Sequence, residues 1–149
     1  MNPPQRKIID MWGKVHNTIF ENLTDSIGED KLRNILYQPL KQLGEQSGRQ
    51  IEGDARTIGE AIMDVEKHWE IQGRIIEQND SRFVREVSYC PWSYFKPIGC
   101  KVLGWYMEGF CEAVNPDCKY KLEKLIPEGD DVCIWSITCK DSGSLSDRY

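Results

Sequence analysis

Cysteine is the residue type in this sequence most able to do chemistry, and its six copies all fall in the second half of the chain. They occupy positions Cys90, Cys100, Cys111, Cys118, Cys133 and Cys139. A cysteine acts as a nucleophile or a metal ligand only where its thiolate is stabilised. Otherwise it packs as a small, mostly buried hydrophobe. Both interpretations stay open for these six residues.

Cys90 is the best candidate for a reactive thiol, because it ends a predicted strand and Pro91 forces the chain to turn there. Site-forming side chains concentrate at such turns. Cys111 lies on the apolar face of a predicted helix, which favours a place in the core. If that helix crosses the sheet, we expect Cys90, Cys111 and Cys133 to converge at one end of a cavity. Nothing beyond packing marks Cys100, Cys118 and Cys139.

Proton carriers and aromatic side chains lie close to these cysteines in the sequence. Glu112 follows Cys111 directly, and His68 is the histidine nearest to the predicted sheet. Either could carry a proton for a cysteine nucleophile, although a surface or core position is the commoner fate of such residues. Four aromatic residues either fill the core or, together with Cys133, line a pocket for a flat organic ligand. They are Trp92, Tyr94, Trp105 and Trp135.

The cysteine spacing contains no C-x-x-C pair, so we expect no structural zinc, no other metal and no cofactor. The first ten residues, MNPPQRKIID, hold no apolar signal core. No stretch approaches the ~20 apolar residues that a membrane span requires. These features predict a cytoplasmic protein whose six cysteines are reduced rather than disulfide-bonded.

The net charge of the chain and the distribution of its basic residues limit the classes of partner that it can bind. The formal net charge is -5, and the lysines and arginines are scattered rather than clustered. This distribution gives no electrostatic footprint for a nucleic acid or an anionic membrane. We therefore expect a small molecule as substrate or ligand, with a homodimer left open.

Four helices are expected to position the candidate residues. Apolar residues recur at helical spacing over about 5–23, 28–47, 55–69 and 98–114. His16 lies at the edge of the first apolar stripe, where we expect it to bond a backbone group. Pro39 should break or kink the second helix, because proline cannot donate the backbone hydrogen bond. Asp54 is a suitable N-cap for the third helix.

From Glu70 the apolar period changes from 3.6 to 2, which predicts strands. They are expected at 70–78, 82–90, 118–126 and 131–139. The order is helices followed by a β-β-α-β-β unit, which predicts an α+β fold with an antiparallel sheet. We expect one domain over residues 1–149, with a helical layer at 1–69, the core at 70–139 and a frayed tail at 140–149.

Several of these residues together resemble a known family. Cys90–Pro91, the aromatic residues after them, Asn115–Pro116 and the run from Gly129 to Cys133 resemble the L-2-amino-thiazoline-4-carboxylic acid hydrolase family over about residues 60–138. The resemblance implies a hydrolase that opens a small cyclic amidine or thiazoline at a cysteine-lined site. A more distant similarity to 4-vinyl reductase-type domains implies a non-catalytic binding or sensing module for an apolar or aromatic ligand.

The chain departs from these family patterns at two places. The hydrolases carry a cysteine followed three residues later by an aspartate, whereas Val114 occupies that place after Cys111. The zinc-binding vinyl reductase-type domains carry an acid and a cysteine in the penultimate strand, whereas Leu122–Leu125 supplies only Glu123. Two classes therefore stay open. One is a hydrolase with Cys90 or Cys111 as nucleophile and Glu112 or His68 as proton carrier, and the other is a binding domain.

Overall fold

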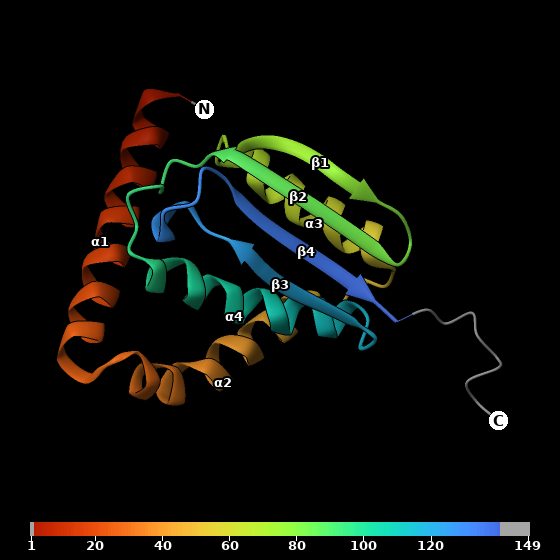
Figure 1. The fold of residues 1–149 in the computed structure, drawn as a ribbon, viewed down its shortest axis with the longest axis horizontal. Coiled ribbons are helices and arrows are strands. Elements are labelled where there is room, and N and C mark those ends of the chain that lie inside the picture. Colours follow the sequence, from red (N-terminus) through yellow and green to blue (C-terminus); the bar gives the residue numbers. More distant parts are fainter. Residues whose placement is uncertain (1, 141–149) are drawn as a thin grey trace.

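The computed structural model describes residues 2–140 of the chain, which form four α-helices, one short 3-10 turn and one four-stranded sheet (Figure 1). The helices are α1 (Pro3–Ile27), α2 (Glu29–Gly48), α3 (Ala55–His68) and α4 (Pro97–Val114). The strands are β1 (Gln72–Gln78), β2 (Arg82–Tyr89), β3 (Cys118–Lys124) and β4 (Cys133–Cys139). This order confirms the predicted α+β fold. The expected frayed tail falls, except for Lys140, outside the described residues.

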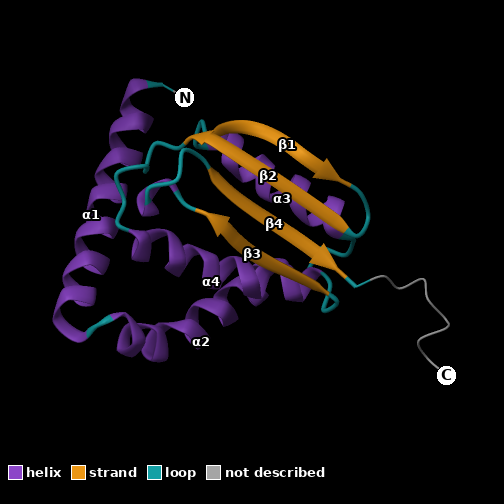
Figure 2. Cartoon of the chain, in the orientation of Figure 1, coloured by secondary structure: helices purple, strands orange, loops and turns teal. Residues whose placement is uncertain are grey.

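The sheet is antiparallel throughout, with the strand order β1-β2-β4-β3 (Figure 2). Two hairpins build it, and α4 connects them. The register pairs Phe83 with Ile137 and Cys118 with Cys139. Side chains alternate between the two faces of a strand, so these residues share one face with Trp135. That face forms the larger core with α3 and α4, through Ile58 and Cys111 among others.

Helix α2 packs on α4 at unusually close range because glycines stand at the crossing. A Cβ atom at Gly44 would overlap the backbone carbonyl of Tyr106, and one at Gly109 would overlap that of Lys41. Pro39 lies inside α2 without ending it, so of the expected break or kink the break is wrong. We attribute the difference to tertiary packing, which holds α2 against α4 on both sides of the proline.

Asp54 and His16 make the contacts that the sequence predicts for them. The Asp54 carboxylate accepts a hydrogen bond from the Thr57 backbone N–H at 3.0 Å, as an N-cap should. His16 Nε2 donates to the Gly99 carbonyl at 3.0 Å, and its ring stacks on Phe95 at 5.0 Å. His16 is therefore a half-buried structural residue that joins α1 to α4.

In three of the helices, some large apolar side chains are exposed although the helical spacing of apolar residues predicts a buried face. In α3, Val65 is half exposed while Glu66 is buried against the sheet. In α4, Leu103 faces solvent, because the helix is buried on its other sides by α2 and β3. In α1, nearly the whole stripe from Ile8 to Leu23 is exposed, and the helix packs through Gly13 and its neighbours instead.

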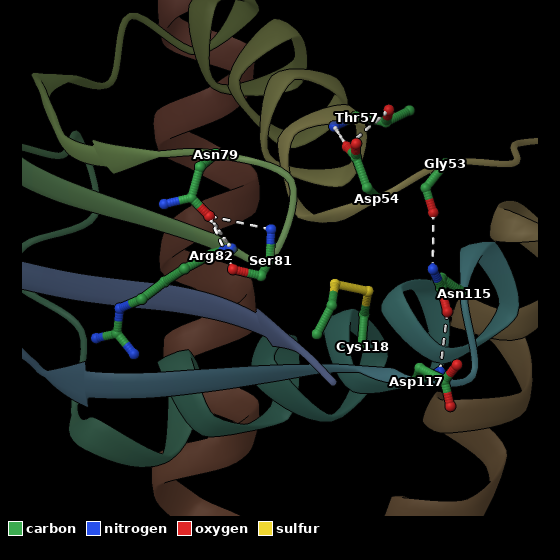
Figure 3. The surroundings of a disulfide bond; sticks show 10 residues. Gly53, Asp54, Thr57, Asn79, Ser81, Arg82, Asn115, Asp117 and Cys118 are labelled. Carbon is green, nitrogen blue, oxygen red and sulfur yellow. Dashed lines mark hydrogen bonds between the residues drawn. A yellow bond between two sulfur atoms is a disulfide. The ribbon is translucent and has the colours of Figure 1, made fainter. Parts of the chain in front are cut away.

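Cys118 and Cys139 are joined by a disulfide, which corrects the expectation that all six cysteines are reduced. The two residues pair directly across β3 and β4, with 3.8 Å between their Cα atoms. Figure 3 shows the bond beside two polar turns. Asn115 in one of them donates to the Gly53 carbonyl at 2.9 Å and accepts from the Asp117 N–H at 2.9 Å. Asn115, a residue of the family motif, thus has a structural role.

Candidate functional site

The first part of the site is the turn that follows β2. Cys90 comes directly after the strand, and the Cys90 thiol accepts a hydrogen bond from the Trp92 backbone N–H. The turn is tied to α1, because the Lys96 N–H donates to the Asn17 side chain at 2.8 Å. Trp92 also packs over Gly13, where a Cβ atom would overlap the indole ring. The Cys-Pro motif therefore fixes Cys90 at the junction of β2, α1 and α4.

The second part is the turn before β4, and it explains the Gly-Asp-x-x-Cys motif. Gly129 has φ 100°, a left-handed conformation that favours glycine. The Asp130 carboxylate accepts from the Leu125 N–H at 2.9 Å and holds the turn closed. The Ile126 N–H then donates to the Cys133 sulfur at 3.2 Å. Each motif cysteine, Cys90 and Cys133, thus receives a backbone N–H, which favours its thiolate form.

The cysteines of the two motifs, Cys90 and Cys133, lie near each other and near Cys100. Cys90, Cys100 and Cys133, here called the thiol cluster, lie close enough for their charges to interact. Burial raises the pKa of Cys90 to about 11 and that of Cys100 to about 12. Burial also raises the pKa of Cys133, although the Ile126 N–H opposes the shift. All three are partly buried thiols at neutral pH, so any nucleophile among them needs a proton acceptor.

Cys111 is not one of these three. It is fully buried in the core, and burial raises the pKa of its thiol to about 12. The charges that act on it come from Glu112 and Lys119 rather than from Cys90 or Cys133. Burial raises the pKa of Glu112, but hydrogen bonds from Lys119 at 2.7 Å and Lys41 at 2.8 Å outweigh it and lower the pKa. Glu112 is thus a stable carboxylate on the outer side of α4.

A pocket of about 270 Å³ opens beside the thiol cluster, between α4 and β3. It is called here the Tyr120 pocket. Its walls are Lys101, Gly104, Trp105, Glu108, Tyr120, Lys121, Leu122, Glu123, Leu125 and Glu128. Lys101, in its wall, follows Cys100 in the chain, and the charges of Cys100 and Cys133 act on the Tyr120 hydroxyl, so the pocket lies near the thiol cluster. Burial and the charges of Glu66, Cys100 and Cys133 raise the pKa of the Tyr120 hydroxyl well above its ordinary value.

Under the sheet, Glu66 connects the two parts of the site. Its carboxylate accepts from Arg85 Nε at 3.0 Å and from Trp135 Nε1 at 2.8 Å, and Glu66 and Arg85 are both buried. Trp135 is in turn in ring contact with Tyr120 at 6.0 Å. The charge of Glu66 acts on both Cys90 and Tyr120. Glu66 therefore holds α3, β2 and β4 together through one carboxylate.

The other predicted site residues lie elsewhere or have packing partners. His68 is exposed, its Nδ1 lies 2.6 Å from the Asp64 carbonyl, and it lines a second pocket of about 410 Å³ between α1 and α3. Trp92 packs on Trp69 at 4.9 Å, and Tyr94 packs on Phe95 at 5.4 Å, both next to α1. Trp105 lies in a wall of the Tyr120 pocket.

Sequence reasoning missed Cys100, Tyr120 and Glu66. The signal for Glu66 was available, because it falls four residues after Ile62 and eight after Ile58 on the buried face of α3. Arg85 lies between Phe83 and Val87 on the inner face of β2. Because a buried charge needs a partner of opposite charge, Arg85 predicts a buried acid such as Glu66. Nothing in the sequence marked Cys100 or Tyr120, since their importance depends on how α4 meets β3.

Within residues 2–140, no group of three or more histidine, cysteine, aspartate or glutamate side chains is arranged to hold a metal ion. None of the helices that the structure describes is both long and apolar enough to cross a membrane.

The order of elements and the two cysteine turns define an α+β domain in which a β-β-α-β-β unit carries the thiols at one end of the sheet. The chain belongs to the L-2-amino-thiazoline-4-carboxylic acid hydrolase family, whose sequence model matches residues 11–135. This confirms the resemblance found from the motifs. No curated protein matches the chain.

Two solved structures share the fold at low sequence identity. One is trafficking protein particle complex subunit 3 from Naegleria fowleri, covalently bound to palmitic acid, with a TM-score of 0.65 and 10% identity over 89% of this chain and 95% of that chain. The other is the phenol-responsive sensory domain of the transcription activator PoxR with phenol, with a TM-score of 0.51 and 12% identity over 93% of this chain and 78% of that chain.

Proposed function

We propose that this protein is a hydrolase that opens a small cyclic amidine or thiazoline ring at the thiol cluster, with Cys90 as nucleophile. The observation that carries the proposal is that Cys90 and Cys133, the cysteines of the two family motifs, lie near enough for their charges to interact and each accept a backbone N–H. Membership of the hydrolase family supports the reaction class. The Tyr120 pocket beside the cluster offers a space of about 270 Å³ for the substrate.

The proposed reaction adds one water across a ring bond in two steps. In the first, the Cys90 sulfur bonds to the amidine carbon, the bond from that carbon to the ring nitrogen or sulfur breaks, and the thiol proton passes to the departing atom. In the second, water attacks the same carbon, its oxygen stays on the carbon, and Cys90 leaves with a proton.

Chromatography and mass spectrometry of a 2-aminothiazoline carboxylate incubated with the purified chain test the proposal. Ring opening by the wild type should fall at least ~100-fold in Cys90→Ser, because the serine hydroxyl is a far weaker nucleophile at neutral pH. The Cys111→Ala variant distinguishes the two nucleophiles expected from the sequence and should retain turnover. Turnover that survives in Cys90→Ser and is lost in a folded Cys111→Ala would overturn the assignment.

A second candidate function is a non-catalytic binding or sensing domain. The observation in its favour is that burial raises the pKa of all four free cysteines in residues 2–140, which makes each a weaker nucleophile. The aromatic walls of the Tyr120 pocket suit an apolar or aromatic ligand. Saturable quenching of tryptophan fluorescence by phenol or a related ring, without turnover of any thiazoline, would favour this candidate over the hydrolase.

A further inference from the structure

Helix α1 carries a stripe of large apolar side chains that are exposed in the described chain, the first of which, Ile8, also lines the pocket between α1 and α3. Its opposite side is packed, since Gly13 lies under Trp92 and His16 bonds Gly99. The orientation of the helix is therefore fixed. The stripe consists of exposed large side chains: Ile8, Met11, Trp12, Val15, Ile19 and Leu23. Trp12 is the most exposed of them, at 63%.

We propose that this stripe, called the α1 stripe, binds the α1 stripe of a second copy of the chain in an antiparallel homodimer. Reversing the helix about a point beside Val15 exchanges Ile8 with Leu23 and Trp12 with Ile19, so the stripe matches itself when the direction is reversed. Its apolar residues follow one another at spacings of three and four residues, as they do in paired helices. A two-fold interface uses the same patch on both copies, and the α1 stripe meets that condition.

The charges beside the stripe favour the antiparallel direction. Lys7 near the start of α1 and Asp25 near its end have no ion-pair partner within residues 2–140, and both lie on the same edge of the stripe. In an antiparallel pair, Lys7 of each copy faces Asp25 of the other. In a parallel pair the two copies of this edge lie on opposite sides of the interface, so Lys7 and Asp25 would not meet.

The same charges argue against a lipid surface as the occupant. The N-terminal half of α1 holds Arg6, Lys7 and Lys14, with Asp10 among them, while the C-terminal half holds Glu21 and Asp25. Helices that lie on anionic membranes are instead rich in lysine and arginine along their polar face. A charge distribution that reverses along the helix is complementary to a reversed copy of itself.

The size of the α1 stripe suits a weak to moderate dimer. Six half-exposed large side chains from each copy would remove on the order of 1,000 Å² from water, which is near the lower limit of specific protein interfaces. We therefore expect association in the micromolar range rather than an obligate dimer.

Sedimentation equilibrium of the full chain tests the proposal between about 1 and 100 µM, where a micromolar dimer is half formed. The wild type should associate to a dimer. The double variant Trp12→Lys, Ile19→Lys should weaken association at least ~10-fold with unchanged circular dichroism, because both side chains are exposed. The matched control is Ile35→Lys, on an equally exposed position of α2, which should leave the dimer intact.

A charge reversal tests the direction of the helices. Lys7→Glu should weaken the dimer by roughly threefold, because it places two acidic groups opposite each other at both ends. Adding Asp25→Lys in the same chain should restore wild-type association. A wild type that stays monomeric at the highest concentration, a dimer lost in Ile35→Lys but not in the stripe variant, or a double charge reversal without rescue would each overturn the proposal.

Discussion

Glu66 and Arg85 form a buried ion pair, with Arg85 Nε 3.0 Å from Glu66 Oε2 and both side chains almost wholly removed from solvent. The pair links α3 to the inner face of β2, and Trp135 of β4 donates to the other oxygen of the same carboxylate. Three elements thus converge on one charged group inside the larger core. Removing Glu66 or Arg85 alone would leave the charge of the other buried without its partner.

Removing one partner of the pair should be costly. Glu66→Gln leaves the Arg85 charge buried without an anion, and we expect a loss of about 3–5 kcal/mol in the free energy of unfolding. The double variant Glu66→Leu, Arg85→Met removes both charges and should lose less than Glu66→Gln does. Urea unfolding followed by tryptophan fluorescence measures both. A Glu66→Gln protein within about 1 kcal/mol of wild type would contradict a tightly coupled pair.

The crossing of α2 and α4 should not accept even one methyl group. In Gly44→Ala the new Cβ would overlap the Tyr106 carbonyl, which belongs to a backbone that cannot move aside alone. We expect a loss of about 2–3 kcal/mol in the free energy of unfolding, as for other overpacked sites. Ser47→Ala, on the exposed side of the same helix, is the control and should stay within about 0.5 kcal/mol. Equal stabilities for the two variants in urea melts would disprove the close approach.

The disulfide should contribute measurably to stability. Cys118 and Cys139 are separated by 21 positions, and closing a loop of that length is worth about 3 kcal/mol in the chain-entropy description. Reducing agent should therefore lower the thermal midpoint of the wild type. The same agent should have no such effect on a Cys118→Ala, Cys139→Ala variant, which starts from the lower midpoint. A wild-type midpoint that ignores the reductant would show that the bond does not form in solution.

The buried thiols predict a loss of stability in alkaline solution. Burial raises the pKa of Cys111 from its ordinary value of 9.0 to about 12, so the unfolded chain loses this proton at a lower pH than the folded chain. The buried Cys111 thiol therefore contributes its full stabilisation below pH 9. As the pH rises from there towards 12, the free energy of unfolding falls by up to ~1.4 kcal/mol per pH unit for this one thiol. Urea unfolding between pH 8 and about 10.5 should show a shallower decline in Cys111→Ala than in wild type. Parallel declines would contradict the raised pKa.

The fold was predictable because each element has a strong local signal. The change from helical to alternating spacing at Glu70 locates the hairpin, and Asp54 marks the start of α3. Pro39 does not end α2, because the loss of one backbone hydrogen bond counts for less than the packing of α2 on α4. The bonding of Cys118 to Cys139 depends on the register of β3 and β4, which no single strand encodes.

The candidate site was predictable only in part. The sequence marks Cys90 because it ends a strand just before Pro91. It marks Cys133 because it follows the turn at Gly129. The apolar face of its helix favoured a core position for Cys111, and the structure buries it there, where the charges of Cys90 and Cys133 do not act on it. Cys100 looked like packing, and the same helix brings its first turn to the thiol cluster. Such distinctions depend on how two elements meet, which spacing within one element does not encode.

The most direct test of the central claim, that the site is the thiol cluster, is competitive thiol labelling of the native chain with peptide mapping. Cys90 and Cys133 should react before Cys111, because Cys111 is fully buried and the other two are partly exposed. A saturating thiazoline substrate or analogue should slow the labelling of Cys90 at least ~10-fold while leaving Cys111 unchanged. Labelling of Cys90 that is indifferent to the ligand, or a ligand that protects Cys111 instead, would contradict the account.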